Sequence, residues 1–429
     1  MEELLKINYE KYYLDNGLKV ILYPDNSLPV VSINIWYRVG SANESKGKTG
    51  FAHLFEHMMF QGSKHIPKQM HFKYVQEAGG NLNGSTNLDR TNYYQSVPSN
   101  YLELILWLES DRMGFLLPAL SQEKLDNQID VVKNERRQRY ENAPYGLANE
   151  IITSSLYPQN HPYHWPTIGW MQDISNITLE DVKFFFNKYY VPNNASLVIG
   201  GDFDNKMTKE LIEKYFGQIN TASLIPELSA PEFSLNKNIY ITHEDNVQLS
   251  RIYLIWHSSR AYTQDDAALD ILAYILTGSK SSRLYKHLVY DKEIAQNVSA
   301  YQYSAKLDGS FYIVATAKPG ITLDQLKEEI FSQLNILIEE GIEDYELFKA
   351  RNSIKSSFIY SMQNLDSIVN HLNEYEYYLN EPDSFISELK RFRNITGDQI
   401  KNAINHFLNN YYLELRIVPK QRETENNEL

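Results

Sequence analysis

The order of strand-like and helix-like segments in the first half of this 429-residue chain returns in its second half, and this repeat restricts the fold more than any other feature. In each half, strand-like segments lead into amphipathic helical segments: 18–23, 30–39 and 51–62 in the first, 251–256, 265–276 and 282–289 in the second. Placing Gly62 over Gly278 gives an offset of 278 − 62 = 216 residues, close to half the chain. This offset indicates a divergent internal duplication.

A stretch between the two halves, residues 220–237 (NTASLIPELSAPEFSLNK), is rich in Pro, Ser and Asn and has no clear hydrophobic periodicity. Such a composition is typical of a linker. At roughly 100–200 residues per domain, the chain is also too long for one ordinary core. We therefore predict an N-terminal domain at 1–219 and a homologous C-terminal domain at 238–429. Because strands and helices mix within each half, both domains are predicted to be α+β.

The composition excludes several classes of function. Asp and Glu number 54 and Lys and Arg 41, so the formal net charge of −13 argues against a nucleic-acid partner. The chain has no cysteine, which excludes disulfides, thiol catalysis and thiolate-bound metals. No window of about 18 apolar residues predicts a transmembrane helix, so no membrane partner is expected. No signal peptide is visible, which favours a cytoplasmic protein, or a periplasmic or exported one if a signal has been removed.

The segment 51–60 (FAHLFEHMMF) is the most informative for function. His53 and His57 are four residues apart, so both rings project from one face of a helix, and Glu56 lies on the same side. The apolar residues at 51, 54, 55, 58 and 59 form the opposite face. Two imidazoles and a third ligand would hold zinc with one tetrahedral position open for water, and a nearby carboxylate could take the proton from that water. Glu56 is placed to be this base.

The third ligand should come from another helical segment. The segment 123–140 offers three carboxylates, those of Asp126, Asp130 and Glu135, and sequence spacing alone does not choose among them.

Several ordered motifs together resemble the M16 (pitrilysin/insulinase) metallopeptidases, of the shorter kind related to the mitochondrial processing peptidase. His53 to His57 form the inverted zincin motif H-x-x-E-H. Further matches span nearly the whole chain: 79–83 (GGNLN), 89–94 (DRTNYY), 131–139 (VVKNERRQR), 189–202 (YYVPNNASLVIGGD) and 278–284 (GSKSSRL). In the family, the glutamate of the second motif is the third zinc ligand and lies nearly eighty residues after the second histidine. Glu135 lies 135 − 57 = 78 residues after His57.

The resemblance implies one Zn²⁺ per chain, held by His53, His57 and Glu135, with Glu56 as general base. It implies two similar α+β domains, each a mostly antiparallel sheet packed with helices. Peptides or unfolded protein segments would be cleaved in a chamber formed by two such half-molecules. The segment 83–86, with Asn83 and Gly84, is similar to the edge strand on which the family binds substrate by strand addition. Without the resemblance, 79–87 would be interpreted as a Gly/Asn turn.

The chain departs from the family pattern around the site. Gln128 stands where a glutamate often supports the site, seven residues before the ligand glutamate, so we expect it to hydrogen-bond near the metal without bringing charge. Gly84 stands where alanine is usual. The C-terminal domain is predicted to lack the metal motif, because Leu269, Leu272 and Ala273 align with His53, Glu56 and His57.

A further departure concerns an Arg and a Tyr that hold substrate and stabilise the oxyanion in active members. Val289 and Gln296 occupy these two positions here. We therefore predict a zinc-bearing subunit of a heterodimer whose M16-like partner supplies the Arg/Tyr pair. The alternatives are a self-sufficient homodimer that uses other donors, such as Tyr290 or Tyr301, and a non-catalytic peptide-binding or assembly subunit of the same fold.

Overall fold

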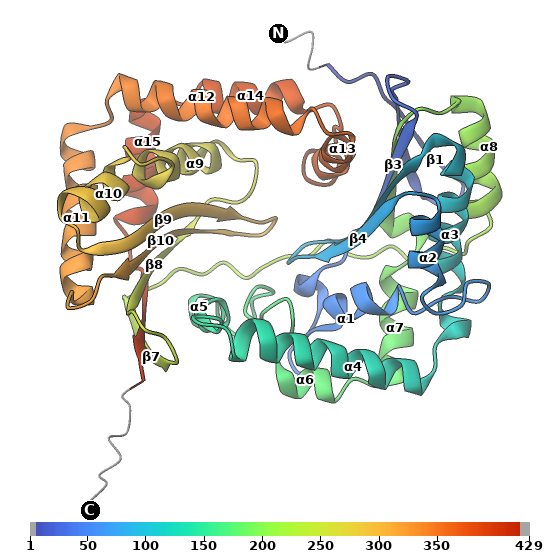
Figure 1. The fold of residues 1–429 in the computed structure, drawn as a ribbon, viewed down its shortest axis with the longest axis horizontal. Coiled ribbons are helices and arrows are strands. Elements are labelled where there is room, and N and C mark those ends of the chain that lie inside the picture. Colours follow the sequence, from blue (N-terminus) through green and yellow to red (C-terminus); the bar gives the residue numbers. More distant parts are fainter. Residues whose placement is uncertain (1–5, 421–429) are drawn as a thin grey trace, which may run out of the picture. The chain divides into compact units, whose positions relative to one another are not determined.

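The computed structural model describes residues 6–420, which form two compact units. The first unit takes in residues up to 136, 159–231 and 356–389, and the second takes in 137–158, 232–355 and 390–420 (Figure 1). The boundary at Pro231 and Glu232 lies in the stretch 220–237, which contains no helix or strand. Each unit also includes a segment from the other half of the chain.

A six-stranded sheet forms the centre of the first unit, in the order β1-β2-β6-β3-β5-β4. Its strands are β1 (Glu10–Tyr13), β2 (Lys19–Pro24), β3 (Val30–Tyr37), β4 (Asn81–Thr86), β5 (Thr91–Pro98) and β6 (Ala195–Gly201). β2 and β6 are parallel, and the other pairs are antiparallel. Every residue of β6 is buried, as expected of a central strand with both faces covered.

The second unit contains a five-stranded sheet in the order β7-β11-β8-β10-β9. Its strands are β7 (Ile239–Asp245), β8 (Arg251–Ser258), β9 (Ala295–Ser304), β10 (Gly309–Ala317) and β11 (Leu413–Pro419). β7 and β11 are parallel, and the other pairs are antiparallel. Without β1, the first sheet has the same order of strands and the same single parallel pair. The predicted fold class, two α+β domains with mostly antiparallel sheets packed with helices, is confirmed.

Helices pack on both sheets. The first unit contains α1 (Phe51–Met58), α2 (Met70–Glu77), α3 (Leu102–Phe115), α4 (Gln122–Arg136), α6 (Met171–Ser175), α7 (Leu179–Tyr189), α8 (Asn205–Phe216) and α13 (Leu365–Leu379). The second contains α5 (Ala148–Leu156), α9 (Gln264–Thr277), α10 (Arg283–Tyr285), α11 (Leu323–Glu340) and α15 (Gly397–Ala403), while α12 (Asp344–Ser361) and α14 (Phe385–Arg393) cross the division between the units.

Capping residues set where several of these helices begin. Thr178, Thr322 and Thr396 precede α7, α11 and α15, and each hydroxyl accepts from the backbone N–H three residues later. In each case the side chain of that third residue bonds back to the threonine N–H, which completes a capping box.

Buried polar contacts tie α13 to the sheet of the first unit, although the helix is distant in sequence. Asn373 Nδ2 donates to the Asn34 carbonyl over 2.9 Å, and Ser196 Oγ donates to Asn373 Oδ1 over 2.5 Å. Glu376, which is 1% exposed, forms an ion pair with the buried Lys19 of β2. Because an unpaired buried charge is costly, these contacts require α13 to lie on this sheet.

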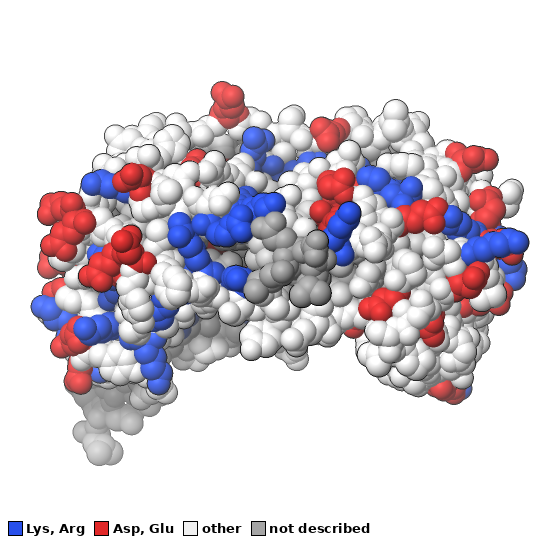
Figure 2. Space-filling model, turned by 90° about the horizontal axis from the view of Figure 1, so that it is seen from above, with Lys and Arg blue, Asp and Glu red and all other residues white. Residues whose placement is uncertain are grey.

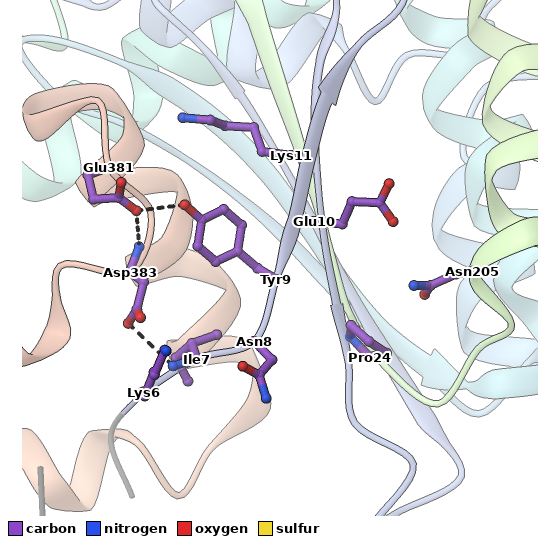
Figure 3. A pocket seen from close by; sticks show the side chains of 10 residues that line it. All are labelled: Lys6, Ile7, Asn8, Tyr9, Glu10, Lys11, Pro24, Asn205, Glu381 and Asp383. Atoms are coloured by element: carbon purple, nitrogen blue, oxygen red, sulfur yellow. Dashed lines mark hydrogen bonds between the residues drawn. The ribbon is translucent and has the colours of Figure 1, made fainter. Parts of the chain in front are cut away.

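The N-terminal segment is anchored near the C-terminal end of α13. Tyr9 Oη donates to the Glu381 carboxylate over 2.6 Å, and the Ile7 N–H donates to Asp383 Oδ1 over 3.3 Å. Lys6 and Lys11 line an open cavity with these residues (Figure 3). These hydrogen bonds therefore hold the N-terminal segment against the first unit.

The net charge does not produce a uniformly acidic surface on the face drawn in Figure 2, where Lys and Arg side chains lie among Asp and Glu side chains. Within residues 6–420, no helix has the length and apolar character needed to cross a membrane.

Two elements differ from their local sequence pattern. Residues 81–86 form strand β4, whereas the Gly/Asn composition of 79–87 alone suggested a turn. Pairing with β5 along all six residues explains the strand, because cross-strand contacts override a weak local preference. The helix expected over 123–140 ends as an α-helix at Arg136 and continues as a π-helical turn over 137–141.

The buried His71 of α2 predicts that stability falls in acid. Burial lowers the pKa of His71 well below its ordinary value, and the charge of Arg112 acts in the same direction. Below pH 6.5 the unfolded chain therefore binds more protons than the folded chain, and stability should fall by up to about 1.4 kcal/mol per pH unit. Urea unfolding of the metal-free protein at about pH 7 and about pH 5 measures the change in the free energy of unfolding between the two pH values. This change should be smaller for His71→Gln than for the wild type, and an equal change would contradict the prediction.

Candidate metal and catalytic site

Helix α1 carries its apolar residues into the core of the first unit. Phe51, Leu54, Phe55 and Met58 are buried, as the sequence pattern predicted. The Phe55 ring stacks on an aromatic cluster from α7 and the residue after it, with centroids 5.3 Å from Phe185 and 4.8 Å from Tyr190. This packing fixes the rotation of α1 about its axis, so the opposite face holds the polar residues in a set direction.

The start of α1 is stabilised by a side chain that sequence reasoning did not single out. The residue before the helix, Gly50, is in the left-handed region with φ of 89° and offers no capping side chain. Glu44 instead accepts from the Gly50 N–H over 2.9 Å and from the Ala52 N–H over 2.8 Å. A carboxyl group at a helix N-terminus satisfies free N–H groups. Burial raises the pKa of Glu44 to about 8, although the hydrogen bonds from the backbone N–H groups lower it. The path of the backbone before α1 brings Glu44 to these N–H groups, and sequence spacing alone could not predict this contact.

The side chains of His53, His57 and Glu135 come together where α1 packs against α4. Glu135 Oε2 lies 3.7 Å from His53 Nε2 and 3.2 Å from His57 Nε2, and the three ligand atoms all lie within 4.8 Å of one another. Atoms bound at about 2.0–2.1 Å to a tetrahedral centre lie roughly 3.3 Å apart, so two imidazoles and a carboxylate at these separations suit a zinc ion. The side chains are 13%, 25% and 16% exposed, which leaves access for water.

Of the three carboxylates that the sequence offered on α4, Glu135 is the one in this group. Asp130 and Asp126 precede it by five and nine residues, which turns their side chains about 140° and 180° away around the helix axis. Asp126 instead accepts from Gln122 Nε2 over 2.8 Å.

The side chain of Glu56, a residue of α1, is bound by the edge strand β4. Thr86 Oγ1 donates to Glu56 Oε2 over 2.7 Å. Burial raises the pKa of Glu56 above its ordinary value, while the Thr86 hydrogen bond and the charges of His57 and Arg90 lower it. Thr86 and Arg90 were missed by sequence reasoning, although Thr86 lies in the segment 83–86.

The strand β4 ends the sheet, and its residues pair with β5 along one edge. Asn83 is exposed and Gly84 is buried, and Asn83 Oδ1 accepts from the Gly84 N–H over 2.9 Å. A Cβ atom at position 84 would lie 3.2 Å from Glu56 Cγ. This close approach explains why glycine suits the position.

Gln128 lies two turns before Glu135 on α4 and is buried. Its Nε2 donates to Asn127 Oδ1 over 2.9 Å. A role for Gln128 in supporting a metal site stays a prediction.

In the second unit, α9 follows β8 as α1 follows β3 in the first. Its residues at the positions of His53, Glu56 and His57 are Leu269, Leu272 and Ala273, and all three are buried in the hydrophobic core.

The residues aligned with the expected Arg and Tyr also lie in the second unit. Val289 packs against the hydrophobic core, and Gln296 is exposed on β9. Arg283 is held by Glu346 through two hydrogen bonds of 2.7 Å and 2.6 Å, so its guanidinium already has a bidentate partner.

Comparison with known proteins gives consistent matches over most of the chain. Residues 19–165 match the family description "Insulinase (Peptidase family M16)", and residues 176–354 match "Peptidase M16 inactive domain". The zinc protease PqqE of Helicobacter pylori is 31% identical over 372 residues, covering 86% of this chain and 83% of that protein. A probable mitochondrial-processing peptidase subunit beta of Arabidopsis thaliana is 24% identical, covering 83% of this chain and 68% of that protein.

Among solved structures, the crystal structure of a protease from Helicobacter pylori superposes with a TM-score of 0.91 at 28% identity. The match covers 96% of this chain and all of that one.

We expect Glu44→Ala to destabilise the first unit by about 1–2 kcal/mol, because two N–H groups at the start of α1 would lose their acceptor. Urea unfolding of the metal-free protein checks this. Glu77→Ala is a matched control, because that glutamate is 62% exposed and pairs with Lys73 at the surface, where a change of about 0.5 kcal/mol or less is expected. Equal effects of the two substitutions would contradict the capping role.

Proposed function

Because the chain belongs to the M16 (insulinase) family of peptidases, we propose that it is a zinc-dependent endopeptidase subunit that cleaves peptides or unfolded protein segments. The observation that carries this proposal is the group of His53, His57 and Glu135, with Glu56 on the same helix as the two histidines. The name zinc protease, which several relatives carry, supports it.

We assign His53, His57 and Glu135 as the ligands of one Zn²⁺ per chain. When bound, zinc supplies Lewis acidity, which makes a water molecule nucleophilic near neutral pH and polarises a peptide carbonyl. Glu56 accepts the proton that the water loses and can then deliver it to the nitrogen of the leaving amine. Its partly buried position, which raises its pKa, suits a group that both takes and gives a proton.

The edge of β4 is the proposed binding strand for an extended peptide. A strand at a sheet edge offers a row of N–H and C=O groups that a peptide can pair with. Asn83 and Gly84 lie on this strand, and a side chain at position 84 would meet Glu56, because a Cβ atom there would lie 3.2 Å from Glu56 Cγ. A peptide paired here would therefore run past the base.

We propose that a second subunit completes the site by supplying an Arg/Tyr pair. Valine stands at position 289, where the arginine is expected, and the guanidinium of the nearby Arg283 is bound by Glu346. A relative is named as one subunit of a processing peptidase, which supports a paired assembly. Tyr290 and Tyr301, 49% and 43% exposed, are the donors that a homodimer would use instead.

A second candidate function is a non-catalytic peptide-binding or assembly subunit. The match of residues 176–354 to "Peptidase M16 inactive domain" favours it. The intact group of His53, Glu56, His57 and Glu135 favours the peptidase.

Glu56→Gln should leave zinc bound and lower peptide hydrolysis by at least about 100-fold, because the amide cannot accept the proton. A quenched fluorescent peptide and the zinc-loaded chain measure this. Turnover by the chain alone would support a homodimer, and its absence at about one zinc per chain would support the need for a partner. Equal turnover by Glu56→Gln and the wild type would contradict the role of Glu56.

Glu135→Gln should weaken zinc binding by at least about 100-fold, because a charged ligand is lost. Asp130→Asn, on the same helix but a different face, should bind zinc as the wild type does. Competition with a chromogenic chelator gives both affinities. Equal affinities would remove Glu135 from the ligand set.

A further inference from the structure

The base and the peptide-binding strand are joined by one hydrogen bond, from Thr86 Oγ1 of β4 to Glu56 Oε2 of α1. At 2.7 Å it has the normal length of an O–H···O hydrogen bond. Glu56 lies on a helix and Thr86 on a strand, so this bond fixes the carboxylate relative to the sheet as well as to its own helix.

We propose that Thr86 is a positioning residue that sets the orientation of the Glu56 carboxylate. Thr86 holds one oxygen, Oε2, and thereby assigns Oε1 to the water that the base activates. This inference rests on the proposed peptidase function. A carboxylate without this bond would rotate about its last side-chain torsion, which is broad for Glu, and would spend less time in the productive orientation.

The backbone that carries Thr86 is itself held firmly. Arg90 Nη1 donates to the Ser85 carbonyl over 2.9 Å and to Ser85 Oγ over 2.6 Å. The Arg90 guanidinium lies over the Trp36 ring, 5.0 Å from its centroid. Thr86 itself pairs with Thr91 across the turn between β4 and β5. A group that orients a reacting side chain is effective when its own position is fixed, and these contacts fix the position of Thr86.

The position of Thr86 also connects substrate binding with the base. Leu82, Gly84 and Thr86 alternate along β4 and share one face of the strand, and Gly84 and Thr86 both approach Glu56. Thr86 Oγ1 acts on the orientation of the base and not on the main-chain groups of β4 that would pair with a peptide. Loss of the Thr86 hydroxyl should therefore lower kcat rather than raise KM.

The test compares Thr86→Val, which keeps the shape and removes the hydroxyl, with Thr86→Ser, which keeps the hydroxyl. For each zinc-loaded protein, in whichever assembly the wild type is active, zinc content and the kcat and KM of a quenched fluorescent peptide are measured. We expect Thr86→Val to lower kcat by about 10- to 100-fold with unchanged KM and zinc content, and Thr86→Ser to restore most of the activity.

Unfolding of the metal-free protein adds a readout that does not depend on activity. A double-mutant cycle of Thr86→Val and Glu56→Ala, each of which removes one partner of the hydrogen bond, should give a coupling free energy different from zero. Additive effects would show that the bond does not form.

The outcomes distinguish failure of the positioning role of Thr86 from failure of the proposed peptidase function. Unchanged kcat in Thr86→Val, or a loss that Thr86→Ser does not restore, would overturn the positioning role while Glu56→Gln still abolishes turnover. Hydrolysis that Glu56→Gln leaves unchanged would overturn the proposed peptidase function, and this inference with it.

Discussion

The burial of one face of α1 is the constraint on which the rest of the site depends. Phe51 and Phe55 contact Phe185 of α7 and Met58 is buried, so a single rotation of the helix buries all three. The polar residues between them must then face α4 and β4, where Glu135 and Thr86 meet them. The free energy that orients the two imidazoles is thus hydrophobic in origin, and it is available before any metal binds.

The two units have the same sheet topology but differ in the helix that follows the central antiparallel strand, which has a polar face in the first unit only. In both, a helix follows the central antiparallel strand and packs beside the edge strand. Leu269, Leu272 and Ala273 make α9 apolar where α1 is polar, and α9 is accordingly buried on nearly all sides. Such a helix contributes stability to its unit, whereas α1 leaves two histidines partly exposed. The two copies of the topology therefore differ in this helix: α9 is apolar on the face where α1 carries the two histidines and Glu56.

Local pattern and a family resemblance together predicted most of this fold and the core of the site. The stripe of apolar residues in 51–59 and the spacing of His53 and His57 depend only on helix geometry, so they could be derived from the sequence. Periodicity could not choose Glu135 over Asp130, because that choice depends on how α4 rotates against α1. Glu44 and Thr86 were missed for the same reason, since each meets α1 through a loop or strand whose path is set by tertiary contacts. The Gly/Asn-rich strand β4 carries almost no local signal and forms by pairing with β5.

Each unit contains a segment from the other half of the chain, and this affects how the protein can fold while it is being synthesised. The sheet that carries α1 is covered by α13, which supplies the buried Glu376 that pairs with Lys19 and the Asn373 amide that donates to the Asn34 carbonyl. Residues 356–389 are synthesised after most of the second unit. When the N-terminal half leaves the ribosome, the polar groups of its sheet that bind α13 therefore still lack these partners. Folding of this chain cannot proceed strictly one half at a time, and nascent chains that stop before residue 389 present exposed sheet surface of the kind that chaperones bind.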